Sequence, residues 1–356
     1  MSRFSRIAAM AAALLLGGQA LAADPVKVGF VYVGPVGDHG WSYQHDHARK
    51  AIEAHFGDKV KTSFVEDVAE GADSERVINQ FGQQGFDLVF TTSFGFMNPT
   101  VKVANRFPKV KFEHATGYKR TDNLATYAAR FYEGRAVIGT IAGHMTKSNV
   151  IGYVAPFPIP EVVRGINAFT IAMRAVNPKA EVKVIWTNSW YDPGREREAA
   201  ETLIAQGADI ISQHTDSPAP VQVAQEKGVF AFGQASDMSR FGPDAHLTAI
   251  VDDWAPYYIE RVQAVIDGTW KSTDTWGGLA SGMVVMTPYS AKMTPEARAA
   301  AEKMEAAIRE GKYHPFQGPI KNQAGEVVVK DGETVPDEKL LSMDWYVEGV
   351  QGRLPK

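Results

Sequence analysis

A regular alternation of two kinds of segment, which begins after Pro25, limits the folds open to this chain more than any other feature. Short runs rich in β-branched and aromatic residues alternate with stretches whose apolar residues recur at the helical period, and Gly, Pro or Asp joins them. This alternation predicts an α/β fold in which helices cover parallel sheets. The number of units suits two sheets of similar size better than one doubly wound sheet.

The individual elements can be placed along the chain. Strands are expected at 27–33, 61–66, 88–92, 111–116, 150–155, 182–188, 209–214 and 229–233. Helices are expected at 41–55, 73–84, 161–176, 195–206 and 218–227. The break between the two sheets is expected near 130–134, after which a helix through Met145 opens a second series. Further on, the pattern predicts a strand at 247–254, a helix at 255–268, an extended segment at 277–287, a charged and exposed helix at 296–309 and a hairpin between 315 and 332.

Composition and charge narrow the possible functions. The 356 residues carry 37 Lys and Arg against 41 Asp and Glu, a formal net charge of −4, and 45% of them are apolar. This apolar content excludes a disordered chain, and the scattered basic residues form no face that would neutralise the phosphates of a nucleic acid. The chain has no Cys, which excludes disulfides, a thiolate nucleophile, Cys-ligated zinc and iron–sulfur clusters.

The first residues are typical of a secretory signal. Two Arg precede an apolar run at 7–16, and Ala-Leu-Ala at 20–22 places small residues where a signal peptidase reads them. The expected cleavage lies before Ala23, which gives a signal peptide at 1–22 and an exported, soluble mature chain. The run is shorter than the roughly 20 apolar residues that span a bilayer. A buried first helix at 7–22 is the alternative.

The loop at 34–41 joins the first expected strand to the first expected helix, which is where ligands bind in parallel α/β sheets. Its residues match neither the phosphate-binding loop that ends in Gly-Lys-Ser/Thr nor the Gly-x-Gly-x-x-Gly pattern. Asp38 would repel a phosphate there and suits a helix cap instead. Trp41 at the mouth of this loop is either core filler or a platform for a flat ligand.

A second indole, Trp190, occupies the matching place in the second series, between the strand at 182–188 and the helix at 195–206. Two rings, one from each unit, could close on a planar molecule from both faces. Stacking of a nucleobase on an aromatic ring contributes about 1–3 kcal/mol per ring, which would make capture depend on closure of the two units. Two unrelated Trp residues are the alternative.

The residue types that enzymes use do not form a recognisable set. His45 and His47 are two positions apart, so they do not share a helix face as a metal site on a helix requires. Ser93 lies outside any Gly-x-Ser-x-Gly sequence. Neighbouring acids such as Asp252 and Asp253 are expected to be solvated or to cap helices. The sequence therefore predicts no catalytic residues, no metal and no cofactor.

Four motifs that occur in order resemble one family. They are Gly-Asp-His-Gly-Trp-Ser at 37–42, Ser-Trp-Tyr-Asp-Pro at 189–193, Gln-Gly-Ala-Asp-Ile-Ile at 206–211 and Met-Asp-Trp-Tyr-Val-Glu-Gly-Val at 343–350. Over nearly all of its mature length the chain resembles the basic membrane protein family of ABC-transporter substrate-binding proteins. The resemblance implies a type I periplasmic binding fold, with two doubly wound α/β lobes joined by a multi-strand hinge. Characterised relatives bind purine nucleosides, with the base between two aromatic rings that match Trp41 and Trp190.

The resemblance also implies an organisation and a set of partners. The N-terminal lobe is expected at 23–130, completed by a segment near 255–285, and the C-terminal lobe at 131–254, completed by 286–356. A purine ligand and an ABC permease in the inner membrane are the expected partners, with no nucleic acid and a monomeric state. Because the chain has no Cys to carry a lipid anchor, the protein is expected to diffuse in the periplasm.

Three departures from the nucleoside-binding relatives change the expected ligand. Where those relatives hold the ribose hydroxyls with two Asp and a Lys, the matching positions here are Thr116, Ala235 and Asp252. A methyl group cannot replace a carboxylate that binds two hydroxyls without the loss of both hydrogen bonds, each contributing about 0.5–1.5 kcal/mol. The ligand is therefore expected to be a free purine base such as adenine, hypoxanthine or xanthine.

Further candidate contacts complete the expected site. Candidates to read the polar edge of the base are Gln234, Glu113, Thr116, Asp216 and Asp252, and further ligand-binding candidates are Asp38, Ser42, Phe94 and Asp237. A purine nucleoside receptor in which Asp237 or Asp253 holds the sugar is the alternative within the class. An enzyme of nucleobase or nucleoside metabolism is the alternative from another class, and no catalytic set supports it.

Overall fold

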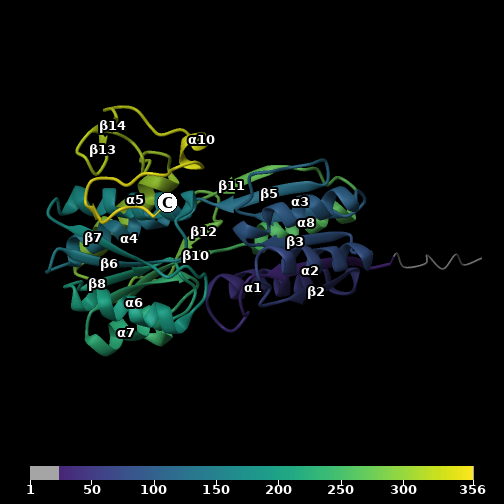
Figure 1. Cartoon of the computed structure of the whole chain (residues 1–356), viewed down its shortest axis with the longest axis horizontal. Coiled ribbons are helices and arrows are strands. Elements are labelled where there is room, and N and C mark those ends of the chain that lie inside the picture. The colour runs from purple at the N-terminus through teal and green to yellow at the C-terminus, as the bar shows by residue number, and fades with distance from the viewer. Residues whose placement is uncertain (1–23, 356) are drawn as a thin grey trace, which may run out of the picture.

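The computed structural model describes residues 24–355 and shows two bodies side by side along the longest axis of the molecule (Figure 1). The first body contains a six-stranded parallel sheet, and the second contains a seven-stranded sheet in which the pair β10–β12 is antiparallel. Helices cover both faces of each sheet, which confirms the α/β class expected from the sequence. We call these bodies the first lobe and the second lobe.

The first sheet has the strand order β11-β5-β4-β3-β1-β2. Its strands are β1 (Val26–Tyr32), β2 (Val60–Val65), β3 (Leu88–Thr92), β4 (Lys111–Ala115), β5 (Leu124–Ala129) and β11 (Asp274–Gly277). All five residues of β3 are buried, as expected for a central parallel strand that is covered on both faces. On the α8 side, the rings of Phe30 and Phe90 stack with their centroids 5.0 Å apart.

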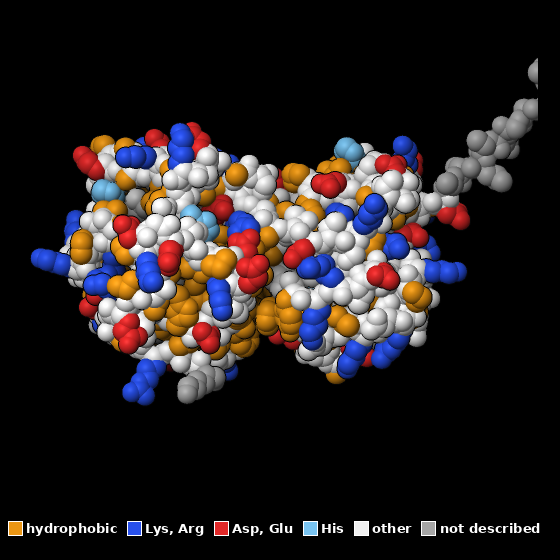
Figure 2. Space-filling model, turned by 90° about the horizontal axis from the view of Figure 1, so that it is seen from above, with side chains coloured by type: hydrophobic (Ala, Val, Ile, Leu, Met, Phe, Trp, Pro, Cys, Tyr) orange, Lys and Arg blue, Asp and Glu red, His pale blue; other side chains and the backbone are white. Residues whose placement is uncertain are grey.

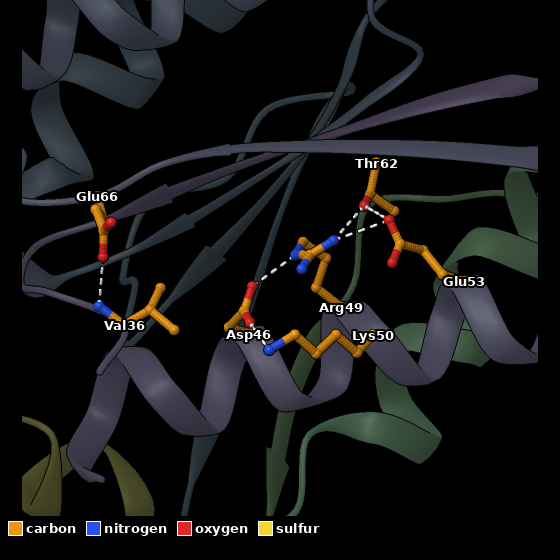
Figure 3. A network of polar contacts seen from close by, with 7 residues as sticks. All are labelled: Val36, Asp46, Arg49, Lys50, Glu53, Thr62 and Glu66. Atoms are coloured by element: carbon orange, nitrogen blue, oxygen red, sulfur yellow. Dashed lines mark hydrogen bonds and ion pairs between the residues drawn. The ribbon is translucent and has the colours of Figure 1, made fainter. Parts of the chain in front are cut away.

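The helices of the first lobe form two layers. On one face α1 (Gly40–Phe56) packs against α8 (Ala255–Ile266), and on the other α2 (Ala72–Gln83) packs against α3 (Met97–Arg106). Figure 3 shows how α1 is fixed to the neighbouring strand β2: Arg49 donates to Asp46 over 2.6 Å and to Thr62 over 2.7 Å. This network sets the position of the helix that begins at the cleft described below.

The second sheet has the strand order β12-β10-β9-β8-β6-β7-β15. Its strands are β6 (Val150–Ala155), β7 (Glu181–Trp186), β8 (Ile210–Gln213), β9 (Phe230–Ala235), β10 (His246–Asp252), β12 (Val284–Met286) and β15 (Val350–Gln351). Helices α4 (Phe131–Met145) and α5 (Pro160–Val176) pack together on one face, and α6 (Pro193–Ala205) and α7 (Ala219–Lys227) on the other. The remaining elements of this lobe are α9 (Pro295–Arg309), α10 (Asp337–Leu340) and the antiparallel pair β13 (Ile320–Lys321) and β14 (Val327–Val329).

The chain crosses between the lobes after β5, after β10 and after β11. The second crossing returns the chain to the first lobe as α8 and β11, and the third brings it back as β12. These connections lie together where the lobes meet (Figure 1). Several adjacent connections of this kind can act as a hinge, because a change of a few backbone angles in each rotates one lobe against the other.

Most expected strands and helices coincide with the observed ones to within two residues. The structure adds α3 and β5, which the sequence analysis did not place. The helix α3 contains Pro99 and three β-branched residues, and β5 contains three Ala, so intrinsic propensity argued against both. Burial of Val103 and Ala104 of α3 against the sheet, and pairing of β5 with two strands, override that propensity.

The helix at 296–309 is not exposed all round, as its charge pattern suggested. Its small residues Ala297 and Ala301 and the apolar Ile308 are buried, and the helix packs against α4. Small side chains allow the two helix backbones to approach closely, a feature that a count of charges does not detect.

Two further expectations concern the ends of the chain and its surface. The expected signal peptide at 1–22 lies outside the described residues. None of the helices formed by residues 24–355 has both the length and the apolar character that a membrane crossing requires. Figure 2 shows charged side chains of both signs interspersed over the two lobes on the face it presents, unlike the basic face that nucleic-acid binding requires.

Glu113 of β4 connects the first sheet to the returning segment. Its carboxylate is fully buried and accepts hydrogen bonds from Arg261 over 2.5 Å, from the Tyr257 hydroxyl over 2.8 Å and from Trp270 Nε1 over 2.7 Å. Burial raises the pKa of Glu113, while the Arg261 guanidinium acts to lower it. The structure contradicts the expectation that Glu113 reads the ligand, because its partners belong to α8 and the segment after it, and Glu113 does not line the cleft described below.

Removal of this carboxylate should destabilise the protein strongly. Glu113→Ala leaves Arg261 buried without its counter-charge, and we expect the free energy of unfolding to fall by about 3–5 kcal/mol. Urea denaturation followed by circular dichroism measures this loss. The matched control is Glu198→Ala, an exposed residue of α6, which should change stability by less than about 0.5 kcal/mol. Equal stability of the two variants would contradict the structural role of Glu113.

Candidate functional site

A cavity lies between the two lobes. It is lined by Val33, Trp41, Ser93, Phe94, Thr116, Phe131, Glu161, Trp190, His214, Asp216, Gln234 and Asp252. Most of these residues lie at or just after the carboxyl end of a strand, in both sheets. This is the edge at which parallel α/β sheets bind ligands, because the connecting loops can be shaped there without disturbing the sheet.

Trp41 stands in the first turn of α1 and is held from one side. Its Nε1 donates to the backbone carbonyl of Thr92 over 2.7 Å, and its ring packs edge-on against His45 and Trp254. The side chain is only partly buried, and it lines the cavity. Because one edge is anchored in the core, the ring has a fixed orientation before any ligand arrives.

The loop before Trp41 is shaped by contacts within the first lobe and across the cleft. Val36 N donates to Glu66 over 2.6 Å (Figure 3), and Gly34 N donates to the Ser42 hydroxyl over 3.3 Å. Gly40 has φ +80°, and a Cβ there would lie 2.6 Å from the carbonyl oxygen of Asp216 in the second lobe. Only glycine permits this close approach of the two lobes.

Trp190 lies on the other side, in the loop between β7 and α6. Its backbone carbonyl accepts from Asp216 N over 3.0 Å, and its ring lies beside Phe157 at 5.3 Å between centroids. Its Nε1 reaches across the cleft to Glu70 of the first lobe, 3.2 Å away. The loop continues into α6, where Asp192 caps the helix by accepting from Arg195 N over 3.0 Å.

Three acids form much of the polar wall. Burial raises the pKa of Asp252, and the neighbouring Glu161 raises it further. Burial and the charge of Glu196 raise the pKa of Asp216 well above its ordinary value. A hydrogen bond from the Trp41 backbone N–H acts to lower it. Burial likewise raises the pKa of Glu161, while two nearby arginines act to lower it. The cleft thus holds acids at a density that would be unfavourable if all were ionised.

Two buried arginines lie behind this wall. Arg135 is fully buried, donates to the Gln213 carbonyl over 2.8 Å and to Gln234 Oε1, and stacks on the Phe131 ring at 4.8 Å. Arg164 donates to the Leu340 carbonyl over 3.3 Å. Neither guanidinium is within ion-pair distance of a cleft acid among the described residues. Their positive charge therefore offsets the acids only at longer range.

His214 completes the polar lining and is neutral. Burial and repulsion by Arg135 and Arg164 hold its pKa well below the ordinary value. Its Nε2 lies 4.0 Å from Glu161, and its buried Nδ1 has no hydrogen-bond partner among residues 24–355. A neutral imidazole with a free ring nitrogen can donate to or accept from a polar ligand.

Strained backbone is found at the same edge. Thr116 after β4 and Ala235 at the end of β9 have φ values of +59° and +58°, and Asn188 after β7 has φ +52°. A left-handed conformation is unusual for any residue with a Cβ and is an outlier for β-branched Thr. Such strain costs about 1–3 kcal/mol per residue and concentrates at binding sites. The backbone conformation at these strand ends therefore lowers stability, as is typical of residues at binding sites.

The structure brings together seven of the residues expected to form the site. Those that line the cavity are Trp41, Trp190, Phe94, Thr116, Asp216, Gln234 and Asp252. Ser42 lies behind the loop and accepts from Gly34 instead. Asp38 is exposed and pairs with Arg240 of the second lobe, so it joins the lobes outside the cavity. Asp237 is also exposed, and its carboxylate accepts from Ser239 N over 2.8 Å.

Several lining residues were missed in the sequence. His214 and Ser93 each follow a strand directly, and Phe131 follows β5 with one residue between them, so their positions alone could have indicated them. Glu161 was read as the first residue of a helix, and the cleft position of that helix start depends on the long loop after β6. Among residues 24–355, no grouping of His, Asp and Glu has an arrangement that could hold a metal ion.

Comparison with known proteins supplies a context for this cleft. A family model described as ABC transporter substrate-binding protein, PnrA-like, matches residues 25–318. The chain is 55% identical to a purine-binding protein of Brucella abortus (strain 2308) over 350 residues, which is 98% of this chain and 100% of that protein. It is 38% identical to a Haloferax volcanii protein provisionally named as an ABC transporter glucose-binding protein, over 95% of this chain and 84% of that protein.

Solved structures agree on the fold. An ABC transporter solute-binding protein from Aeropyrum pernix K1 superposes with a TM-score of 0.70 at 18% identity, over 89% of this chain and 97% of that one. A second solute-binding protein, from Conexibacter woesei DSM 14684, gives a TM-score of 0.64 at 22% identity, over 81% and 98% of the two chains. The type I periplasmic binding fold implied by the sequence motifs is confirmed.

The acids of the cleft should cost stability at neutral pH. In the folded chain the pKa of Asp216 is raised. The contribution of this group to the free energy of unfolding is therefore most favourable below its unfolded pKa of about 3.9. That contribution is lost as the pH rises through the higher pKa of the folded state. Asp216→Asn removes the ionisation, and we expect it to raise the free energy of unfolding of the ligand-free protein by about 0.5–2 kcal/mol at pH 7.

Urea denaturation at pH 7 and pH 4 checks this prediction. The gain should shrink at pH 4, where the folded wild-type Asp216 already holds its proton. Asp331→Asn, an exposed residue on the surface of the second lobe, serves as the control and should have no effect at either pH. A wild type that is more stable than Asp216→Asn at pH 7 would contradict the assignment.

Proposed function

The chain belongs to the Bmp family of PnrA-like ABC transporter substrate-binding proteins, and we propose that it captures a free purine base and delivers it to an ABC permease. The observation that carries this proposal is the pair of Trp side chains, one from each lobe, that line the same cavity. The 55% identity to a purine-binding protein over the whole chain supports the ligand class.

The two Trp residues suit a flat aromatic ligand. Trp41 is fixed through its Nε1 to the first lobe, and Trp190 comes from the second lobe and contacts Glu70 of the first. A base between the two rings is stacked on both faces only when the lobes are closed, at about 1–3 kcal/mol per ring. Binding of the ligand would then stabilise the closed arrangement that a permease can recognise.

The remaining lining favours a base without a sugar. Thr116 places only a hydroxyl and a methyl group at its strand end, and its Oγ1 donates to its own neighbour, the Ala115 carbonyl, over 2.7 Å. Ala235 is fully buried at the end of β9 and is not among the residues that line the cavity. Neither residue can bind two vicinal ribose hydroxyls. Buried hydroxyls left without partners cost about 1–3 kcal/mol each, which is why a nucleoside is disfavoured here.

The biological setting follows from the family. We propose a monomeric receptor in the periplasm with lobes at 23–130 and 131–254, completed by the later crossings, that needs no cofactor. Members of the family are binding proteins of ABC transporters. The Ser93 hydroxyl in the cleft donates to the Glu70 carboxylate over 2.5 Å, which also accepts from Trp190 Nε1, so we assign this carboxylate to positioning the cleft wall. A purine nucleoside is the alternative ligand. Glucose is a second one, because a relative is provisionally named as a glucose-binding protein.

The ring pair gives the first test. Trp41→Ala and Trp190→Ala should each weaken binding of adenine by about 1–3 kcal/mol, because each removes one stacking face. Trp41→Phe and Trp190→Phe should retain most of the affinity, since a π-face persists. Isothermal titration calorimetry measures the affinities, and thermal unfolding checks that each variant folds. Trp276→Phe is a control, because Trp276 lies on β11 and does not line the cavity. Unchanged affinity in both Ala variants would contradict the sandwich.

The choice between base and nucleoside gives the second test. Adenine or hypoxanthine should bind at least about tenfold more tightly than adenosine or inosine, since one unsatisfied hydroxyl alone corresponds to that factor. The double variant Thr116→Asp and Ala235→Asp should narrow the difference. Calorimetry on one preparation, with glucose as a third ligand, makes the comparison. Tighter binding of the nucleosides, or binding of glucose alone, would reject the free-base proposal.

A further inference from the structure

Asp252 at the end of β10 is an unusual group for a folded protein. Its side chain is 0% exposed, and neither carboxyl oxygen has a hydrogen-bond partner among residues 24–355. It nevertheless lines the cleft. A buried polar group without a partner is strongly unfavourable, and an ionised one far more so. The structure therefore leaves two oxygen atoms to be satisfied by whatever fills the cavity.

The charged groups around Asp252 do not compensate a negative charge on it. Glu161 of α5 and Asp216 after β8 are acids that repel it, and His214 is neutral. Arg135 of α4 acts to lower the pKa of Asp252, but it forms no ion pair with it among residues 24–355, and two of its nitrogens donate to the Gln213 carbonyl and Gln234 Oε1. Tyr258 of α8 faces it as a neutral phenol, whose hydroxyl lies 2.6 Å from that of Tyr127.

We propose that Asp252 binds the ligand in its protonated form, through both oxygens, with one O–H donated to a ring nitrogen and one C=O accepting from an adjacent N–H. This inference rests on the proposed function and names the part of the base that is read. A neutral carboxylic acid offers one donor beside one acceptor. Its complement is an edge on which a bare nitrogen and an N–H are neighbours. Adenine presents such a pair on each of its edges, which makes it the probe of choice.

An ionised carboxylate would require a different ligand edge. Two acceptor oxygens need two donors, as in an edge that carries two adjacent N–H groups. The side chain of Asn separates the two possibilities, because its amide has one donor beside one acceptor in the same shape as a protonated Asp. Asp252→Asn therefore preserves binding if Asp252 is protonated and abolishes one hydrogen bond if it is ionised.

The experiment measures adenine binding by calorimetry from pH 6 to pH 9 for wild type, Asp252→Asn and Asp252→Leu. We expect Asp252→Asn to bind within about threefold of wild type at pH 6, and Asp252→Leu to lose about tenfold or more, because a buried edge of the base is left unpaired. Wild-type affinity should fall as pH rises, since binding needs the proton. Because both proteins bind the same adenine, the ratio of wild-type to Asp252→Asn affinity cancels the effect of adenine's own titration.

Three results would overturn the proposal while leaving purine binding intact. They are a loss of about tenfold or more in Asp252→Asn, wild-type affinity that rises with pH relative to Asp252→Asn, and unchanged affinity in Asp252→Leu. Thermal unfolding confirms that each variant folds, and Asp331→Asn, on the exposed surface, controls for the Asp-to-Asn change. Failure of wild type to bind any purine base would instead reject the proposed function on which this inference rests.

Discussion

The structure depends on acidic side chains at or just after the carboxyl ends of strands, Asp252 fully buried and Asp216 partly buried, which have no ion-pair partner among residues 24–355. Asp252 and Asp216 enter the cavity from the second sheet, and the arginines behind them donate to backbone and amide oxygens rather than to these acids. Such an arrangement opposes folding, because each acid must hold a proton or carry an uncompensated charge in a medium of low dielectric constant. It is favourable only when a ligand supplies the missing hydrogen bonds. We propose that the same residues account for the cost to stability and for the binding of the ligand.

Backbone strain is found at the cleft, and the contacts between the lobes lie at the edges of the cleft, whereas the cores of the lobes are regularly packed. The left-handed Thr116 and Ala235 lie at strand ends that face the cleft, whereas the core of each lobe is packed from unstrained strands and helices. Contacts across the cleft connect the lobes at its edges, including Gly40 N with the Ser236 hydroxyl at 2.7 Å and Trp190 with Glu70 at 3.2 Å. Polar contacts of this kind can break and re-form as the lobes move, while the buried Glu113 cluster keeps the first lobe intact.

Much of the fold and the centre of the site could be predicted from the sequence, because both depend on local patterns. Period-two and period-3.6 runs placed the strands and helices, and the rule that ligands bind at strand carboxyl ends located Trp41 and Trp190. Glu113 was misread because its partner Arg261 is 148 residues away in sequence, and no local pattern shows that pairing. Asp38 was misplaced for the same reason, since Arg240 lies in the other lobe. Glu161 was not predicted as a lining residue, because the sequence at the start of a helix does not show whether that helix start faces a cavity.

We propose that one cavity holds a purine base between two indole rings, with an acid on the edge of the base. The most direct measurement is a crystal structure of the protein grown with adenine. The account predicts the base in the cleft between Trp41 and Trp190, with a ring nitrogen and an N–H within hydrogen-bond distance of the two Asp252 oxygens. Adenine bound outside this cleft, or adenine within it that contacts neither indole ring, would contradict the account.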